Sequence, residues 1–252
     1  MSNFENAGAR TSASAPPLRT WDFWETTLVT LIAYGVYMLA GGLAATFIVG
    51  LQDGVAKMSP AQFQDFASQG RWFGPVIAIA SPLTIAVLWI AIRKAGRGFA
   101  EYLALNWPSR GEVVRALLIS AIIMGAETLS GLLIGSEFGT PDSFLIVKGP
   151  GGLLALLIAV CIAVPIMEEF IFRGFTFRGW SESFLGPTGA IVLTSIAWAM
   201  IHTQYDWFGR FWIFVSGLAL GHFRWRSNST WLTVIAHSAM NIVAFLSTGP
   251  YT

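Results

Sequence analysis

The stretch GPGGLLALLIAVCIAVPIMEEFIFR, residues 149–173, combines the two features that decide the fold. Its first part has no charged residue up to Met167. That part is close to the length of about 20 residues that a helix needs to cross a bilayer. It then runs directly into Glu168 and Glu169, and Arg173 follows on the next turn. Ionisable groups at membrane depth are costly unless they are paired or hydrated. The stretch therefore predicts a membrane-spanning helix that carries polar chemistry.

The composition of the whole chain agrees with a membrane protein. Of its 252 residues, 54% are hydrophobic and only 12% are charged, against about 25% charged in an ordinary soluble domain. A disordered chain shows the opposite balance, so disorder is excluded as well. The formal net charge of +1 provides no basic field for nucleic acid. A single cysteine excludes an intramolecular disulfide.

Seven apolar stretches are candidates for spanning helices, so the predicted fold is an all-α, polytopic transmembrane bundle. Six or eight spans remain possible, because the sixth stretch is short and contains His222. The third stretch contains Glu127, which has no cation on the same helix face within four residues. The stretches are residues 26–51, 72–92, 116–136, 149–167, 186–205, 211–223 and 230–247.

The domain organisation and orientation follow from the polar segments. Residues 1–20 are rich in Ser, Ala and Pro and are expected to form a flexible tail, followed by one transmembrane domain over residues 21–252. Basic residues mark cytoplasmic loops. With seven spans, most loop Arg and Lys residues share the side of the N-terminus. We therefore expect an integral, multi-pass protein with a cytoplasmic N-terminus, in the inner membrane if its source is bacterial.

The first polar motif contains two adjacent carboxylates with different expected roles. Glu169 and Arg173 are four residues apart on a helix, a spacing that allows an ion pair on one face. Glu168 lies about 100° further round the helix and cannot share that pair equally well. Glu168 is therefore the carboxylate left for another task, such as general base catalysis. The ordinary alternative is that all three side chains form an interfacial ion-pair cluster.

Two further motifs place polar side chains on later apolar stretches. Trp198 and His202 are four residues apart, and so are His237 and Asn241, so each pair shares a helix face. His237 and Asn241 could donate hydrogen bonds to a developing oxyanion. The ordinary alternatives are a histidine beside an interfacial aromatic belt and hydrogen bonds between helices.

The three motifs, in this order on three apolar helices, resemble the CAAX protease and bacteriocin-processing family of intramembrane endopeptidases, which includes the Rce1-type prenyl-protein proteases. The resemblance covers the motif region, residues 149–247. The family usually has Phe where this chain has Trp198, which is a conservative aromatic change. The resemblance implies an Rce1-like helical fold and the hydrolysis of membrane-associated proteins or peptides.

Residue roles carried over from the resemblance define a predicted catalytic set. Glu168 would be the general base, and His202 would help it to hold and activate a water molecule. His237 and Asn241 would form the oxyanion site. The family is regarded as glutamic-type, so the resemblance implies no cofactor. Supporting roles would fall to Glu169, Arg173 and Trp198.

Other functions remain open at this point. Glu168, His202 and His237 are also suitable zinc ligands, although the helical His-Glu-x-x-His motif is absent. Intramembrane Glu and His residues serve proton-coupled transporters as well. A non-catalytic immunity or scaffold protein could use the same fold. The expected partners are the bilayer and a membrane protein or peptide substrate, with no nucleic acid, and Glu127 receives no catalytic role.

Overall fold

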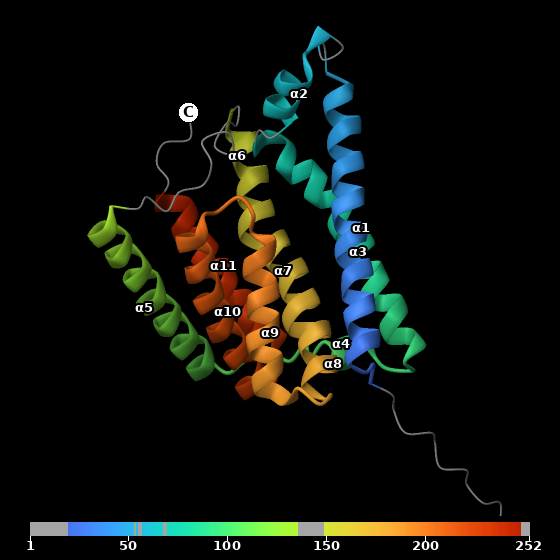
Figure 1. Cartoon of the computed structure of the whole chain (residues 1–252), viewed down its shortest axis with the longest axis vertical. Helices are drawn as coiled ribbons and strands as arrows, with labels where there is room; N and C mark the ends of the chain where they lie inside the picture. The colour runs from blue at the N-terminus through green and yellow to red at the C-terminus, as the bar shows by residue number, and fades with distance from the viewer. Residues whose placement is uncertain (1–19, 53, 55–56, 68–69, 136–148, 248–252) are drawn as a thin grey trace, which may run out of the picture.

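The structure is a computed structural model of the chain, and it describes residues 20–52, 54, 57–67, 70–135 and 149–247 (Figure 1). All regular secondary structure in these ranges is helical, which confirms the predicted all-α class. The predicted tail of residues 1–20 lies outside the described residues except for Thr20. The division into a tail and one transmembrane domain therefore stays a prediction.

The helices follow one another along the chain with few long connections. Some are short turns or segments of a longer helix, and two segments, η4 and η5, are π-helical. Their bounds are α1 (Phe23–Gly50), α2 (Pro60–Ala67), η2 (Gly70–Trp72), α3 (Phe73–Lys94), α4 (Phe99–Tyr102), α5 (Arg110–Ile134), α6 (Gly149–Ile158), η4 (Ala159–Ala163), α7 (Val164–Glu169), η5 (Phe170–Thr176), α8 (Phe177–Ser181), α9 (Gly186–Ile201), α10 (Trp207–Ser227) and α11 (Thr230–Ser247).

Each of the seven predicted stretches falls on a helix, but the helix bounds differ. Among the described residues, five helices are long and apolar enough to span a membrane: α1, α3, α5, α11 and the continuous helix Gly152–Ser181. α9 is apolar but shorter, and α10 is not among the five. The fourth stretch was predicted to end near Met167, yet its helix continues to Ser181 because the polar motif lies within it.

Local sequence signals set where several helices begin. Asp22 and Glu25 form a capping box at the start of α1, in which each residue's side chain accepts a hydrogen bond from the other's backbone N–H. Ser109 and Glu112 repeat the arrangement at α5. Asp206 caps α10 through a 2.8 Å bond from the Gly209 N–H.

The outer helices expose large apolar side chains, as expected of a surface in contact with lipid. On α1, Leu39 is 65% and Phe47 is 68% exposed. On α5, Ile122 is 71% and Leu132 is 76% exposed. In water such continuous apolar faces would drive association. The helical bundle is therefore that of an integral membrane protein, with the bilayer as its surroundings.

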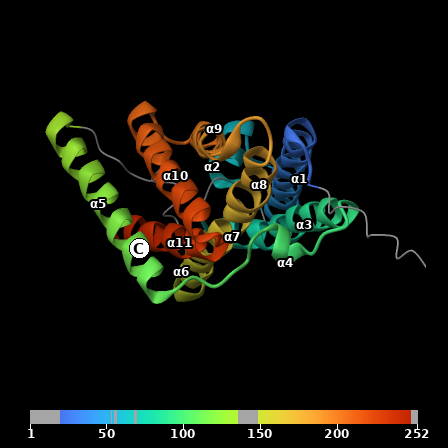
Figure 2. The ribbon, with the colours of Figure 1, turned by 90° about the horizontal axis from the view of Figure 1, so that it is seen from below.

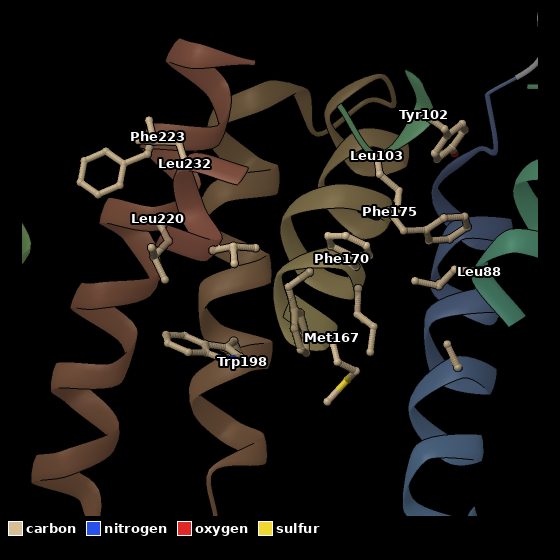
Figure 3. Packing of buried hydrophobic residues seen from close by; sticks show 14 of the residues in the cluster. Leu88, Tyr102, Leu103, Met167, Phe170, Phe175, Trp198, Leu220, Phe223 and Leu232 are labelled. Atoms are coloured by element: carbon tan, nitrogen blue, oxygen red, sulfur yellow. The ribbon is translucent and has the colours of Figure 1, made fainter. Parts of the chain in front are cut away.

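The helix that carries the first motif lies in the middle of the bundle. α1 and α5 stand on opposite sides of it, and α9, α10 and α11 lie between it and α5 (Figures 1 and 2). α5 packs against α10 and α11. Buried side chains of the central helix, including Met167, Phe170 and Phe175, face Leu88 on α3 and Trp198 on α9 (Figure 3). This packing fixes the rotation of the central helix and thereby the directions of Glu168 and Glu169.

Candidate active site

The four residues of the predicted catalytic set border one cavity of about 500 Å³. Glu168 comes from α7, His202 from the end of α9, and His237 and Asn241 from α11. The cavity is also bordered by Trp198, by residues of α1 and by the face of α5 that contains Glu127. The structure thus brings the four residues of the predicted catalytic set and Trp198 to one cavity.

Glu169 lies outside this cavity, in a buried cluster with Arg173 and His237. Arg173 Nη1 is 2.8 Å from Glu169 Oε1, and both side chains are fully buried. The ion pair expected from the four-residue spacing is therefore present. His237 Nδ1 donates a second hydrogen bond, 2.9 Å long, to the same oxygen. Glu169 consequently orients His237, a contact between distant parts of the chain that helix spacing could not reveal.

Glu168 faces the cavity and has a different environment. The indole N–H of Trp198 donates a 2.7 Å hydrogen bond to Glu168 Oε2. Among the described residues, no cation lies within ion-pair distance of Glu168. The two adjacent carboxylates have separate surroundings, as expected: Glu169 pairs with Arg173, whereas Glu168 borders the cavity and accepts a hydrogen bond from Trp198.

The Trp198 side chain contacts both histidines as well as Arg173 and Glu168. The guanidinium carbon of Arg173 lies 4.4 Å from the centre of the indole ring, a cation–π contact. The rings of His202 and His237 each lie 5.1 Å from the indole, edge to face. An indole N–H can reach Glu168, whereas the phenyl ring usual in the family has no such donor.

His202 is held at the end of α9 by its own backbone. As the C-terminal cap, it leaves the helix with φ −80° and ψ 60°. Its Nδ1 donates a 2.7 Å hydrogen bond to the Trp198 carbonyl, one helical turn earlier. In the neutral ring this leaves Nε2 as an acceptor.

Tyr205 is a cavity residue that the sequence analysis missed. Its ring stacks on His202 with centroids 6.2 Å apart. Burial raises the pKa of the Tyr205 hydroxyl, and the negative charges of Glu127 and Glu168 raise it further. Two residues separate Tyr205 from His202 in a short loop, and nothing in that spacing indicated a contact. By contrast, His222 is exposed and lies near Trp225, as an interfacial residue would.

Asn241 fills a gap in the backbone hydrogen bonding of the central helix. The Val164 N–H bonds to Ala159 rather than to Val160, because η4 is π-helical. Pro165 has no N–H that could reach the Val160 carbonyl instead. Asn241 Nδ2 donates to that carbonyl at 2.9 Å. One amide hydrogen of Asn241 is therefore used between helices, as in the alternative interpretation of this motif, and its other polar groups remain at the cavity.

The described residues contain no group of three His, Cys, Asp or Glu side chains arranged to hold a metal ion. Glu168, His202 and His237 thus border the cavity without converging as a ligand set. The described residues therefore offer no ligand set for the zinc alternative, and the expectation of no cofactor stays a prediction.

Comparison with known protein families gives a match that covers the motif region. Residues 150–243 match the family model described as type II CAAX prenyl endopeptidase Rce1-like. No curated protein and no solved structure matches the chain. The matched segment contains all three motifs and every residue of the predicted catalytic set. The motif region of the chain is therefore similar to the Rce1-like family of membrane proteins.

Proposed function

We propose that the protein is an intramembrane endopeptidase that hydrolyses membrane-associated proteins or peptides with a water activated by Glu168 and His202. The family match supports a protease of the CAAX type. The observation that carries the residue assignment is the shared cavity of Glu168, His202, His237 and Asn241. A cavity in the bundle provides the polar, hydrated space that peptide hydrolysis in a membrane needs.

In this proposal, a water molecule sits between Glu168 and His202. Glu168 Oε2 is bonded to Trp198, so its other carboxylate oxygen and His202 Nε2 are the acceptors for the two water hydrogens. The water oxygen attacks the scissile carbonyl carbon while Glu168 takes its proton. The C–N bond then breaks, and Glu168 returns the proton to the leaving amine. Each step uses the carboxylate that Arg173 does not neutralise.

The developing oxyanion would be stabilised from α11. His237 Nδ1 donates to Glu169, so its Nε2 can donate to the oxyanion only when the ring carries both protons. The second amide hydrogen of Asn241 would supply another donor from the same helix face.

The test is a comparison of the wild type with Glu168→Gln, which removes the base but keeps the side-chain size. Comparative proteomics in cells that express each form should show uncut substrate accumulating with the variant. Purified variant in lipid nanodiscs should then fail to cut that substrate, while remaining folded. Glu182→Gln, on an exposed turn, is the matched control and should cut normally. Full cleavage by purified Glu168→Gln would refute the assignment.

We also propose a cytoplasmic N-terminus. The start of α1 lies at the same end of the bundle as the C-terminal ends of α3 and α10 (Figure 1). Those ends carry Arg93, Lys94, Arg224 and Arg226, which agrees with the positive-inside tendency. Labelling of Ser12→Cys in a Cys161→Ser background with a membrane-impermeant maleimide would test this. Labelling of intact cells would contradict the proposed orientation.

A further inference from the structure

Glu127 is a second carboxylate at the proposed catalytic cavity, and the mechanism above does not use it. It lies on α5, half-buried, and borders the cavity together with Met124 on the preceding turn. In the described part of the chain, its carboxylate has no ion-pair partner. A charged group in the membrane without a partner is expensive, so its retention suggests a use.

The charge balance of the cavity wall is one-sided. Glu127 and Glu168 both border the cavity, and no Lys or Arg does so among the described residues. Arg173 lies over the Trp198 ring, is fully buried and is paired with Glu169. Arg210, in the first turn of α10, donates to the backbone carbonyls of Tyr205 and Thr203. Apart from the side chains of His202 and His237, the described cavity wall therefore offers no group that could carry a positive charge beside the two carboxylates.

The electrostatic fields of Glu127 and Glu168 both act on Tyr205 at one side of the cavity. Tyr205, whose ring stacks on His202, is affected by the charges of both Glu127 and Glu168. A group bound beside Tyr205 would thus lie within reach of both fields and next to the proposed catalytic histidine. Aromatic walls supplied by Tyr34 and Trp212 suit the apolar stem of a Lys or Arg side chain, and their ring faces attract its cationic end.

We propose that Glu127 is a specificity-determining residue that selects substrates with a Lys or Arg side chain close to the scissile bond. The inference rests on the proposed function, because it assumes that this cavity receives the peptide. Placing a cation there offsets the cost of two unpaired carboxylates in a medium of low dielectric constant. An apolar substrate leaves that cost in place, and an acidic one increases it.

The test measures binding and so does not depend on cleavage. Three probe peptides, acetyl-Leu-Leu-X-Leu-Leu-amide with X as lysine, norleucine or glutamate, are titrated against the protein in phosphatidylcholine nanodiscs by microscale thermophoresis. The wild type should bind the lysine peptide about tenfold more tightly than the norleucine peptide, which corresponds to about 1.4 kcal/mol. The glutamate peptide should bind more weakly than both.

Glu127→Gln should lower the preference for the lysine peptide over the norleucine peptide, because only Glu168 then remains at the cavity to attract the cation. The matched control is Glu112→Gln on the same helix, because Gln preserves the capping box at the start of α5. This control should keep the wild-type ratio. A ratio near one in the wild type, an unchanged ratio in Glu127→Gln, or an equal loss for all peptides would each overturn the inference.

The outcome also separates this inference from the proposed function. Cleavage that survives Glu168→Gln would refute the catalytic assignment but leave the binding ratio readable. A missing lysine preference together with cleavage that depends on Glu168 would refute only the role of Glu127.

Discussion

Removing Arg173 should destabilise the protein far more than removing the whole Glu169–Arg173 pair. Arg173→Met leaves the Glu169 carboxylate fully buried with His237 as its remaining partner. Breaking a buried pair in this way costs about 3–5 kcal/mol. Replacing both partners by apolar side chains of similar volume is often neutral. Two nitrogens of the guanidinium, Nε and Nη2, also have no hydrogen-bond partner among the described residues, so the intact pair is incompletely satisfied.

The assay is reversible unfolding in mixed detergent micelles, with the free energy of unfolding measured for four proteins. These are the wild type, Glu169→Met, Arg173→Met and the double variant. We expect the double variant to lose less stability than Arg173→Met alone. Glu182→Met breaks an exposed ion pair of the same four-residue spacing, with Arg178, and should cost less than about 1 kcal/mol. Losses that add, or a double variant less stable than either single one, would refute this reasoning.

Three further predictions follow from other contacts. Asn241→Ala should lower the catalytic rate about 100- to 1000-fold if the amide serves the oxyanion. The same variant should lose about 1–3 kcal/mol of stability, because the Val160 carbonyl loses its hydrogen-bond donor. An active variant of normal stability would contradict both roles. Gly179→Ala should lower the free energy of unfolding by about 1–3 kcal/mol in the same assay, because the added methyl group would lie 2.8 Å from the Cβ of Thr26 on α1. Gly125→Ala is the control and should not destabilise the protein, because an added Cβ there has no neighbour within 4 Å. The Arg97 hydrogen bond lowers the pKa of Glu101 from its ordinary value of 4.5, so this carboxylate should stabilise the folded state at neutral pH and lose its contribution as the pH falls through its folded-state pKa. Glu101→Gln should therefore make the free energy of unfolding less dependent on pH in the acid range below 4.5, and an unchanged acid dependence would contradict the assignment.

The fold was predictable because a spanning helix must be about as long as the bilayer is thick, so the length of an apolar stretch indicates a span. The third stretch, residues 116–136, falls on α5, which begins six residues earlier, and Glu127 is the one charged residue between Ala116 and Ile134. The fourth stretch ends at the first charged residue, whereas its helix continues. Charged residues normally mark the membrane boundary. Here Glu169 and Arg173 neutralise each other inside the protein, so the helix continues past them to Ser181.

Contacts in the site could be predicted only where both residues lie on the same helix. The four-residue spacing gave the Glu169–Arg173 pair, and the angle between adjacent residues separated Glu168 from it. The bonds from His237 to Glu169 and from Trp198 to Glu168 join residues far apart in the sequence. Such contacts depend on how α9 and α11 pack on the central helix, which hydrophobic patterning does not specify.

The two adjacent carboxylates need opposite environments for one of them to act as a base. A single buried cation can neutralise only one carboxylate, and Arg173 is committed to Glu169 through the helix spacing itself. Trp198 supplies Glu168 with a neutral hydrogen-bond donor at the cavity. Glu169 in turn holds His237 across the helix interface through a hydrogen bond. The position of the arginine therefore matters, because an arginine in place of Phe172 would lie four residues after Glu168 and could pair with that carboxylate instead. The Glu-Glu-x-x-x-Arg pattern thus places on one helix both the proposed base and a carboxylate that supports His237 on the facing helix.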